Sequence, residues 1–121
     1  MKILIVDDSS IMRRAILKYL TPLGYEIVGT AANGQEAVQL YQANPADLVT
    51  LDITMPQMDG LACLLALKQL NPQVKVLVIS ALSDSQTGLK ALKLGAQSFL
   101  PKPFTEAQLV GEIQRVAGSR T

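Results

Sequence analysis

The sequence predicts an α/β domain in which a parallel sheet is covered by helices on both faces. Two observations support this fold class. Short apolar runs alternate strictly with helical patterns, and four of these runs are followed by charged or hydroxyl side chains. Parallel neighbours in a sheet need crossover connections, which helices between consecutive strands supply. We therefore expect five strands and five helices in a single domain over residues 1–121.

The first two helices lie between the first three strands. Branched and apolar residues predict strands over Ile3–Val6, Tyr25–Ala31 and Leu48–Leu51. Apolar residues at helical spacing predict a helix over Ser9–Leu20, and Asn33 with Glu36 predicts a capping box at the start of the second helix. Both helices end at residues that break helices: Thr21, Pro22, Gly24, Asn44 and Pro45.

The second half of the chain continues the same alternation. A helix over Gly60–Leu70 is apolar around much of its circumference, which a wide buried face explains better than an exposed patch. A continuous apolar run over Val74–Ile79 predicts a central strand that is buried on both faces. The remaining elements are a helix, a strand and a helix: Asp84–Leu94, Gln97–Leu100 and a last helix capped by Thr105 with Gln108.

The composition excludes several kinds of chemistry. The chain has no histidine, which excludes His-containing catalytic triads, the usual zinc sites and a phosphohistidine in this chain. Its single cysteine, Cys63, cannot form an internal disulfide and is expected to be a buried core thiol. The net charge of +1 does not favour binding to nucleic acid or membranes, and no apolar run is long enough to span a bilayer. We therefore expect a soluble, cytoplasmic protein.

Charged and hydroxyl side chains gather at the predicted carboxyl ends of four strands. These residues are Asp7, Asp8, Asp52, Ser80 and Lys102. Any one of them alone would be a solvated loop residue more often than not. Because sites in open parallel sheets form beyond the carboxyl ends of the strands, we expect the five to share one pocket.

The expected pocket has the chemistry of a hard-cation site. Three carboxylates held close together repel one another unless cations compensate them. One lysine and one divalent cation would balance the charge, and oxygen-only ligands favour Mg²⁺, with Mn²⁺ as the next choice. A carboxylate beside Mg²⁺ and a lysine can attack an activated phosphoryl group, which predicts phosphoryl chemistry at Asp52.

Four separated motifs carry a resemblance to a known family. The segments "ILIVDDSSIMRR", "LVTLDITMPQMDG", "VLVISA" and "FLPKPF" resemble the receiver domain of bacterial two-component response regulators, in particular the single-domain, CheY-like type. The resemblance covers essentially the whole chain. It implies a doubly wound, flavodoxin-like fold with strand order 2-1-3-4-5, the order for which CheY is a standard example. The "DDSSIMRR" start is also similar to that of chemotaxis relatives.

The resemblance implies roles for individual residues around the expected metal. Asp52 would be phosphorylated and would also contact Mg²⁺, Asp8 would bind the ion directly, and Asp7 would bind it through water. The backbone carbonyl of Thr54 would be a further ligand, and Lys102 would pair with the phosphoryl group. The Lys102–Pro103 bond would be cis, as is common at this place in the family.

The resemblance also implies a switch. Ser80 matches the hydroxyl that moves toward the phosphoryl group, and Phe99 matches the aromatic residue whose ring turns inward on activation. Thr54 and Leu82 occupy the two positions that tune the lifetime of the phosphoryl group. Because Leu82 is apolar and cannot orient water, we expect slow self-dephosphorylation, which Leu82→Glu would accelerate. Gly88 weakens the fourth helix, and either close packing or mobility would explain it.

The expected partners follow from the same resemblance. A histidine kinase or a histidine phosphotransfer protein would donate the phosphoryl group. A downstream protein would bind the face formed by the fourth helix, fifth strand and fifth helix, and the chain would be a monomer or a phosphorylation-dependent dimer. The chain would catalyse only its own phosphorylation and dephosphorylation.

Three alternatives remain at this point. A Mg²⁺-dependent phosphohydrolase with an aspartyl nucleophile also places Asp at a strand end, but normally has a second acid where Thr54 stands. A flavodoxin-like cofactor module needs a phosphate-binding loop after the first strand, where Asp7 and Asp8 would repel phosphate. The chain could also be the receiver part of a longer DNA-binding regulator.

Overall fold

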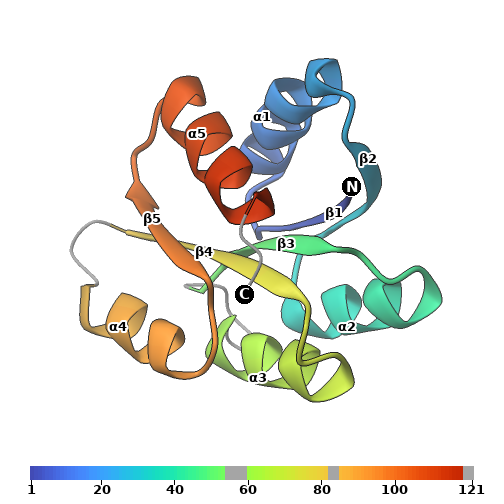
Figure 1. Cartoon of the computed structure of the whole chain (residues 1–121), viewed down its shortest axis with the longest axis vertical. Helices are drawn as coiled ribbons and strands as arrows, with labels where there is room; N and C mark the ends of the chain where they lie inside the picture. The colour runs from blue at the N-terminus through green and yellow to red at the C-terminus, as the bar shows by residue number, and fades with distance from the viewer. Residues whose placement is uncertain (54–59, 82–84, 119–121) are drawn as a thin grey trace.

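The fold is that of a computed structural model, which describes residues 1–53, 60–81 and 85–118. Its strands are β1 (Lys2–Val6), β2 (Glu26–Ala31), β3 (Leu48–Asp52), β4 (Lys75–Ala81) and β5 (Ser98–Lys102). Its helices are α1 (Ser10–Leu20), the 3₁₀ turn η1 (Thr21–Leu23), α2 (Gly34–Ala43), α3 (Gly60–Leu70), α4 (Ser85–Lys93) and α5 (Glu106–Ala117). Figure 1 shows these elements around a central sheet.

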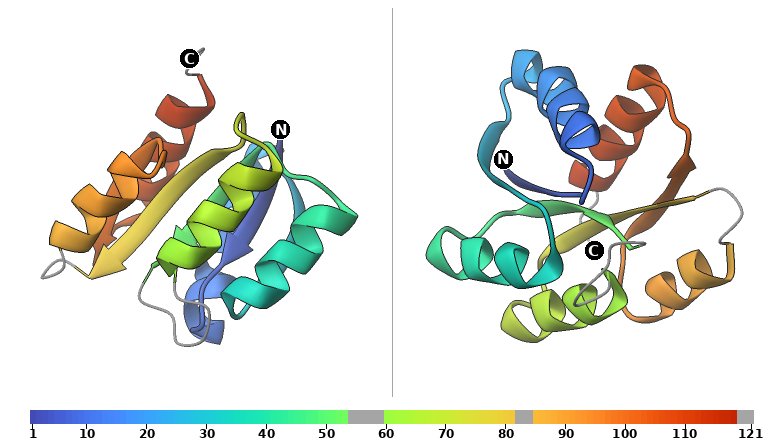
Figure 2. Two further views of the ribbon diagram at one scale, coloured as in Figure 1. Left: turned by 90° about the horizontal axis from the view of Figure 1, so that it is seen from below. Right: turned by 180° about the vertical axis from the view of Figure 1, so that it is seen from behind.

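The sheet has the strand order β2-β1-β3-β4-β5, and each pair of neighbouring strands is parallel. Helices α1 and α5 cover one face, and α2, α3 and α4 cover the other (Figures 1 and 2). The predicted α/β class and the implied strand order are both confirmed. The carboxyl ends of all strands consequently lie along one edge of the sheet.

Side-chain alternation along the strands divides the core into two clusters. In β1, Ile3 and Ile5 pack with α1 and α5, while Leu4 and Val6 pack with α2 and α3. In β4, Leu77 and Ile79 face α1 and α5, whereas Val78 faces the opposite cluster. A strand in the middle of such a sheet needs apolar residues on both faces, which explains the continuous apolar runs.

The carboxyl ends of three strands, β3, β4 and β5, differ from the sequence prediction. Strand β4 continues through Ser80 and Ala81, which pair with Pro101 and Lys102 of β5. Ser80 was expected to follow this strand, and that expectation was wrong, because the ladder with β5 extends the strand by two residues. Lys102 likewise ends β5 instead of following it, and Asp52 is the last residue of β3.

Local hydrogen bonds explain where the helices begin. The Ser9 hydroxyl accepts from the Met12 N–H at 3.2 Å, and the predicted box of Thr105 with Gln108 is present. The predicted box at Asn33 forms only in part: Asn33 accepts from the Glu36 N–H, but the Glu36 carboxylate accepts from Ala32 instead of Asn33. The Glu36 carboxylate therefore bonds one residue before the cap, and the reciprocal bond of a full capping box is not formed.

Helix α3 buries one face and exposes part of its apolar surface. Cys63, Leu64 and Leu67 are buried, as expected for a core helix, and burial raises the pKa of the Cys63 thiol to about 12. Leu65 and Leu70 are exposed, so the wide apolar circumference is only partly explained by burial. Across the part of the chain that is described, no helix is long and apolar enough to cross a membrane.

Candidate phosphoryl-transfer and metal site

Three acidic side chains meet at the carboxyl edge of the sheet. Asp7 and Asp8 directly follow β1, and Asp52 ends the neighbouring strand β3, whose Leu51 is paired with Val6. Each of the three offers a carboxylate oxygen that lies within 4.8 Å of the others. Asp7 and Asp52 are buried and Asp8 is exposed. We refer to these three residues as the acid cluster.

Lys102 supplies the positive charge that faces the acid cluster. Its Nζ lies 3.1 Å from Oδ2 of Asp7 and 3.4 Å from Oδ2 of Asp52, and it donates a hydrogen bond to each. Burial alone would lower the pKa of Lys102, but the carboxylates of Asp52 and Asp7 outweigh it, so that the pKa is raised. The ammonium group is therefore firmly protonated at neutral pH. The peptide bond that follows it, Lys102–Pro103, is cis, as expected.

Asp7 is held by contacts that the sequence did not reveal. Its Oδ1 accepts from the Ser9 N–H at 2.9 Å, and its main-chain carbonyl accepts from the Arg13 guanidinium at 2.7 Å. Burial, aided by the charge of Asp52, raises the pKa of Asp7 despite the opposing effects of Ser9 and Lys102. Arg13 belongs to the "SSIMRR" segment, but only the fold showed that it reaches the start of the site.

The acid cluster fits a hard divalent cation. All of its donor atoms are oxygens, two of the three carboxylates are buried, and one lysine balances only part of their charge. Burial raises the pKa of Asp7, and a cation beside this carboxylate would favour its charged form. Thr54 and Leu82, which were expected to bind the metal and to tune the site, lie outside the described residues.

Ser80 and Phe99 lie on the face of the sheet that packs against α2, α3 and α4. Alternation in β4 puts Ser80 on the face of Val78, and Phe99 of β5 is paired with Val78 and packs against the same cluster. Ser80 is fully buried, and its Oγ has no hydrogen-bond partner among the described residues. An unpaired buried hydroxyl costs free energy, so this side chain would gain from a new acceptor.

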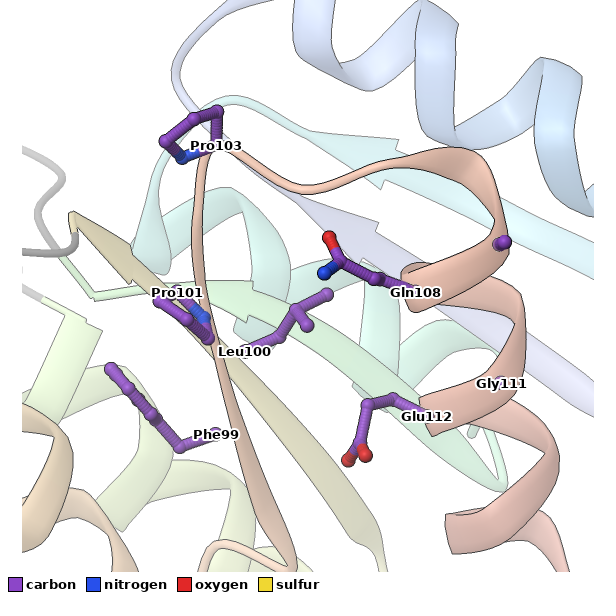
Figure 3. Close-up of a pocket in the computed structure, with 8 residues that line it drawn as sticks. Phe99, Leu100, Pro101, Pro103, Gln108, Gly111 and Glu112 are labelled. Carbon is purple, nitrogen blue, oxygen red and sulfur yellow. The ribbon is translucent and has the colours of Figure 1, made fainter.

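A separate groove lies between β5 and α5, and none of its lining residues belongs to the acid cluster. It encloses about 390 Å³ and is lined by Phe99, Leu100, Pro101, Pro103, Ala107 and Gly111 with two polar residues of α5. Figure 3 shows Phe99 and Leu100 leaving β5 on opposite sides. We refer to this space as the edge groove. It belongs to the face that the sequence predicted for a downstream partner, although the sequence did not indicate a groove.

Comparison with known proteins identifies the family. The model of the response regulator receiver domain matches residues 3–114. The chain is 38% identical over 116 residues to the chemotaxis protein CheY of Thermotoga maritima, covering 96% of this chain and 97% of that protein. It is 40% identical over 114 residues to the chemotaxis protein CheY of Bacillus subtilis, covering 94% of this chain and 95% of that protein.

Solved structures agree with the sequence relatives. A chain of the CheX–CheY–BeF₃–Mg²⁺ complex from Borrelia burgdorferi matches with a TM-score of 0.92 and 37% identity, over 98% of this chain and 90% of that one. The receiver domain of NtrX from Brucella abortus matches with a TM-score of 0.92 and 31% identity, over 98% of this chain and 99% of that one. These matches favour phosphoryl-accepting signalling over the phosphohydrolase alternative. The chain belongs to the response regulator receiver domain family and is a CheY-type phosphoryl acceptor of two-component signalling.

Proposed function

We propose that Asp52 is the side chain that accepts the phosphoryl group, and that Asp7, Asp8 and Lys102 make this transfer possible. The observation that carries the proposal is the geometry of Lys102, whose Nζ bridges the buried carboxylates of Asp7 and Asp52 at 3.1 and 3.4 Å. Asp52 stands at the end of the central strand β3, close to the Lys102 ammonium and to the two other acids. Among the three acids, it is the one that both the sheet position and the "LVTLDITMPQMDG" motif favour.

Asp7, Asp8 and Asp52 would hold Mg²⁺, with Mn²⁺ as a possible substitute and the Thr54 carbonyl as a further ligand outside the described residues. The bound ion would neutralise charge on the acid cluster and on the oxygens of the transferring phosphoryl group. Lys102 would donate a hydrogen bond to the same phosphoryl group. Its Nζ would then give up its present hydrogen bond to the Asp52 carboxylate in favour of a phosphoryl oxygen.

The transfer itself is a single displacement at phosphorus. An Oδ of Asp52 forms the new O–P bond while the P–N bond of a donor phosphohistidine breaks, and the released imidazole nitrogen takes a proton from water. Since this chain has no histidine, the donor must be another protein, namely a histidine kinase or a histidine phosphotransfer protein. The chain would catalyse only this step and the later hydrolysis of its own acyl phosphate.

Ser80 and Phe99 would convert the new charge into a change of surface. The phosphoryl group offers additional acceptor oxygens, and the Ser80 hydroxyl, which has no partner among the described residues, would gain a hydrogen bond by moving toward it. That movement would free space for the Phe99 ring, which packs on the same face of the sheet. Leu82, outside the described residues, would keep the phosphorylated state long-lived.

The face of α4, β5 and α5 would bind the downstream protein. Phe99 packs beside α4 and is also one of the residues of the edge groove, so a movement of its ring would change the surface that this face offers to a partner. The relatives named chemotaxis protein CheY make a chemotaxis pathway our first choice for this chain. The alternative output is the pairing of two copies of this chain through the same face. Phosphorylation would control the binding of the downstream protein or the pairing of the two copies in the same way.

Phosphorylation with a small donor tests the proposal. The wild-type protein is incubated with acetyl phosphate, with and without Mg²⁺, and its intact mass is measured. We expect one phosphoryl adduct that requires Mg²⁺, that is lost in Asp52→Asn and that is retained in the control Asp47→Asn, an exposed acid that bonds to the Lys2 N–H. An adduct that persists in Asp52→Asn, or that forms equally well without Mg²⁺, would contradict the proposal.

A further inference from the structure

Gly88 of α4 lies directly against the ring of Phe99. A Cβ built at Gly88 would lie 2.5 Å from Cε2, 2.6 Å from Cδ2 and 3.0 Å from Cζ of that ring. Carbon atoms that are not bonded pack at about 3.5 to 4.0 Å, so a methyl group and the ring cannot both occupy these positions. The ring therefore packs on the helix backbone at a residue that has no side chain. The sequence alone left open whether Gly88 served packing or mobility, and this contact favours packing.

The packed position leaves part of Phe99 uncovered. The residue is only half-buried, and it also lines the edge groove beside α5. Its ring leaves β5 on the side opposite to Leu100 (Figure 3). The ring thus has a close-packed position against α4, and a ring that left this position would become more exposed to solvent.

The position against α4 is close to the proposed switch hydroxyl. Phe99 is paired with Val78 in the ladder of β4 and β5, and Ser80 follows two residues later on the same face of β4. A ring held against Gly88 consequently lies next to the region from which Ser80 would move. A ring displaced outward would lie on the surface and away from Ser80.

We propose that Gly88 is a positioning residue for Phe99, because the missing side chain creates the space in which the ring rests against α4. The residue at position 88 then sets the balance between this position and more exposed ones. The effect of that balance on signalling rests on the proposed role of Phe99 as a switch. The position of the ring against Gly88 in the unphosphorylated protein is independent of that role.

Fluorine NMR can test the resting position, because the chain has only two phenylalanines, Phe99 and Phe104. Protein labelled with 4-fluorophenylalanine should give two resonances, and Phe99→Leu assigns them. We expect Gly88→Ala to displace the Phe99 resonance and to leave that of Phe104 in place. The matched control is Gly111→Ala in α5, where an added Cβ meets no atom within 4 Å, and it should move neither resonance to a comparable extent.

Stability provides a second measurement. Ala is favoured over Gly inside a helix, and replacing Gly by Ala there should make the equilibrium constant for unfolding about fivefold smaller. Gly111→Ala should show this full gain in urea denaturation, whereas Gly88→Ala should lose it to the clash with the ring. In a Phe99→Leu background, Gly88→Ala should recover the gain, because the shorter side chain can leave the space.

The outcomes separate the proposal from its alternatives. An unmoved Phe99 resonance in folded Gly88→Ala would overturn it, and so would a failure to fold that Phe99→Leu does not rescue. Rescue of folding by Phe99→Leu would support it. All of these measurements use unphosphorylated protein, so they stand even if Asp52 proves not to be the phosphorylated residue.

Discussion

Removal of the Lys102 charge should take the nearest cation away from two buried carboxylates. In Lys102→Met, the side chain keeps much of its apolar stem but loses the ammonium that lies 3.1 Å from Asp7 and 3.4 Å from Asp52. With an effective dielectric constant of about 20, each of these charge pairs is worth about 5 kcal/mol before the cost of desolvation. Desolvation offsets much of this sum, since burying an ion costs several kcal/mol.

The net loss can be estimated from comparable cases. Breaking a buried ion pair by removing one partner costs about 3 to 5 kcal/mol. The Lys102 side chain is 24% exposed, which allows some solvent screening, so we expect a loss of about 3 kcal/mol in the free energy of unfolding. Urea denaturation at neutral pH without divalent cations measures it, with Lys90→Met on the exposed surface of α4 as the control.

The loss should depend on pH and on Mg²⁺. Asp7 already has a raised pKa, and the variant raises it further, so in the variant the native state binds more protons than the unfolded state. The stability of the variant should therefore rise relative to the wild type as the pH falls through that pKa. Mg²⁺ should restore part of the loss at neutral pH. A loss below about 1 kcal/mol, the size expected for an exposed pair, would refute this reasoning, as would a loss that is independent of pH.

Three further predictions concern single side chains. Ser80→Ala should keep or raise the stability of the phosphoryl-free protein by up to about 1 kcal/mol in urea denaturation, because its buried hydroxyl has no partner among the described residues. A larger loss would show that this hydroxyl is bonded. Cys63 should not react with a thiol reagent at neutral pH until the protein unfolds, since it is buried and its pKa is raised to about 12. The hydrogen bond from Arg115 lowers the pKa of Glu112, so its contribution to stability is present above the unfolded pKa and is lost as the pH falls through the lower folded pKa. Arg115→Met should thus lower the free energy of unfolding more at neutral pH than in strong acid, where only its hydrogen bond to Ser98 Oγ remains to be lost, and denaturation curves at both pH values would check this difference.

Local sequence patterns predicted the secondary structure and the location of the site. Apolar runs and helical spacing depend only on neighbouring residues, so strands such as β1 and helices such as α3 were predicted nearly to the residue. The meeting of Asp7, Asp52 and Lys102 followed from a general property of parallel sheets, which brings the carboxyl ends of all strands to one edge. The strand order needed the family resemblance, because periodicity carries no information on which strands become neighbours.

Other features were decided only by tertiary structure. The inclusion of Ser80 in β4 and the packing of Phe99 on Gly88 join different elements of the fold, and the contact of Arg13 with the Asp7 carbonyl needs the approach of α1 to the end of β1. Each depends on the register between two strands or on the exact approach of a helix to the sheet. Such distances result from the packing of the whole core, in which a shift of about one ångström changes which atoms touch. The sequence thus determined which groups are available at the edge of the sheet, and close packing determined which of them are in contact.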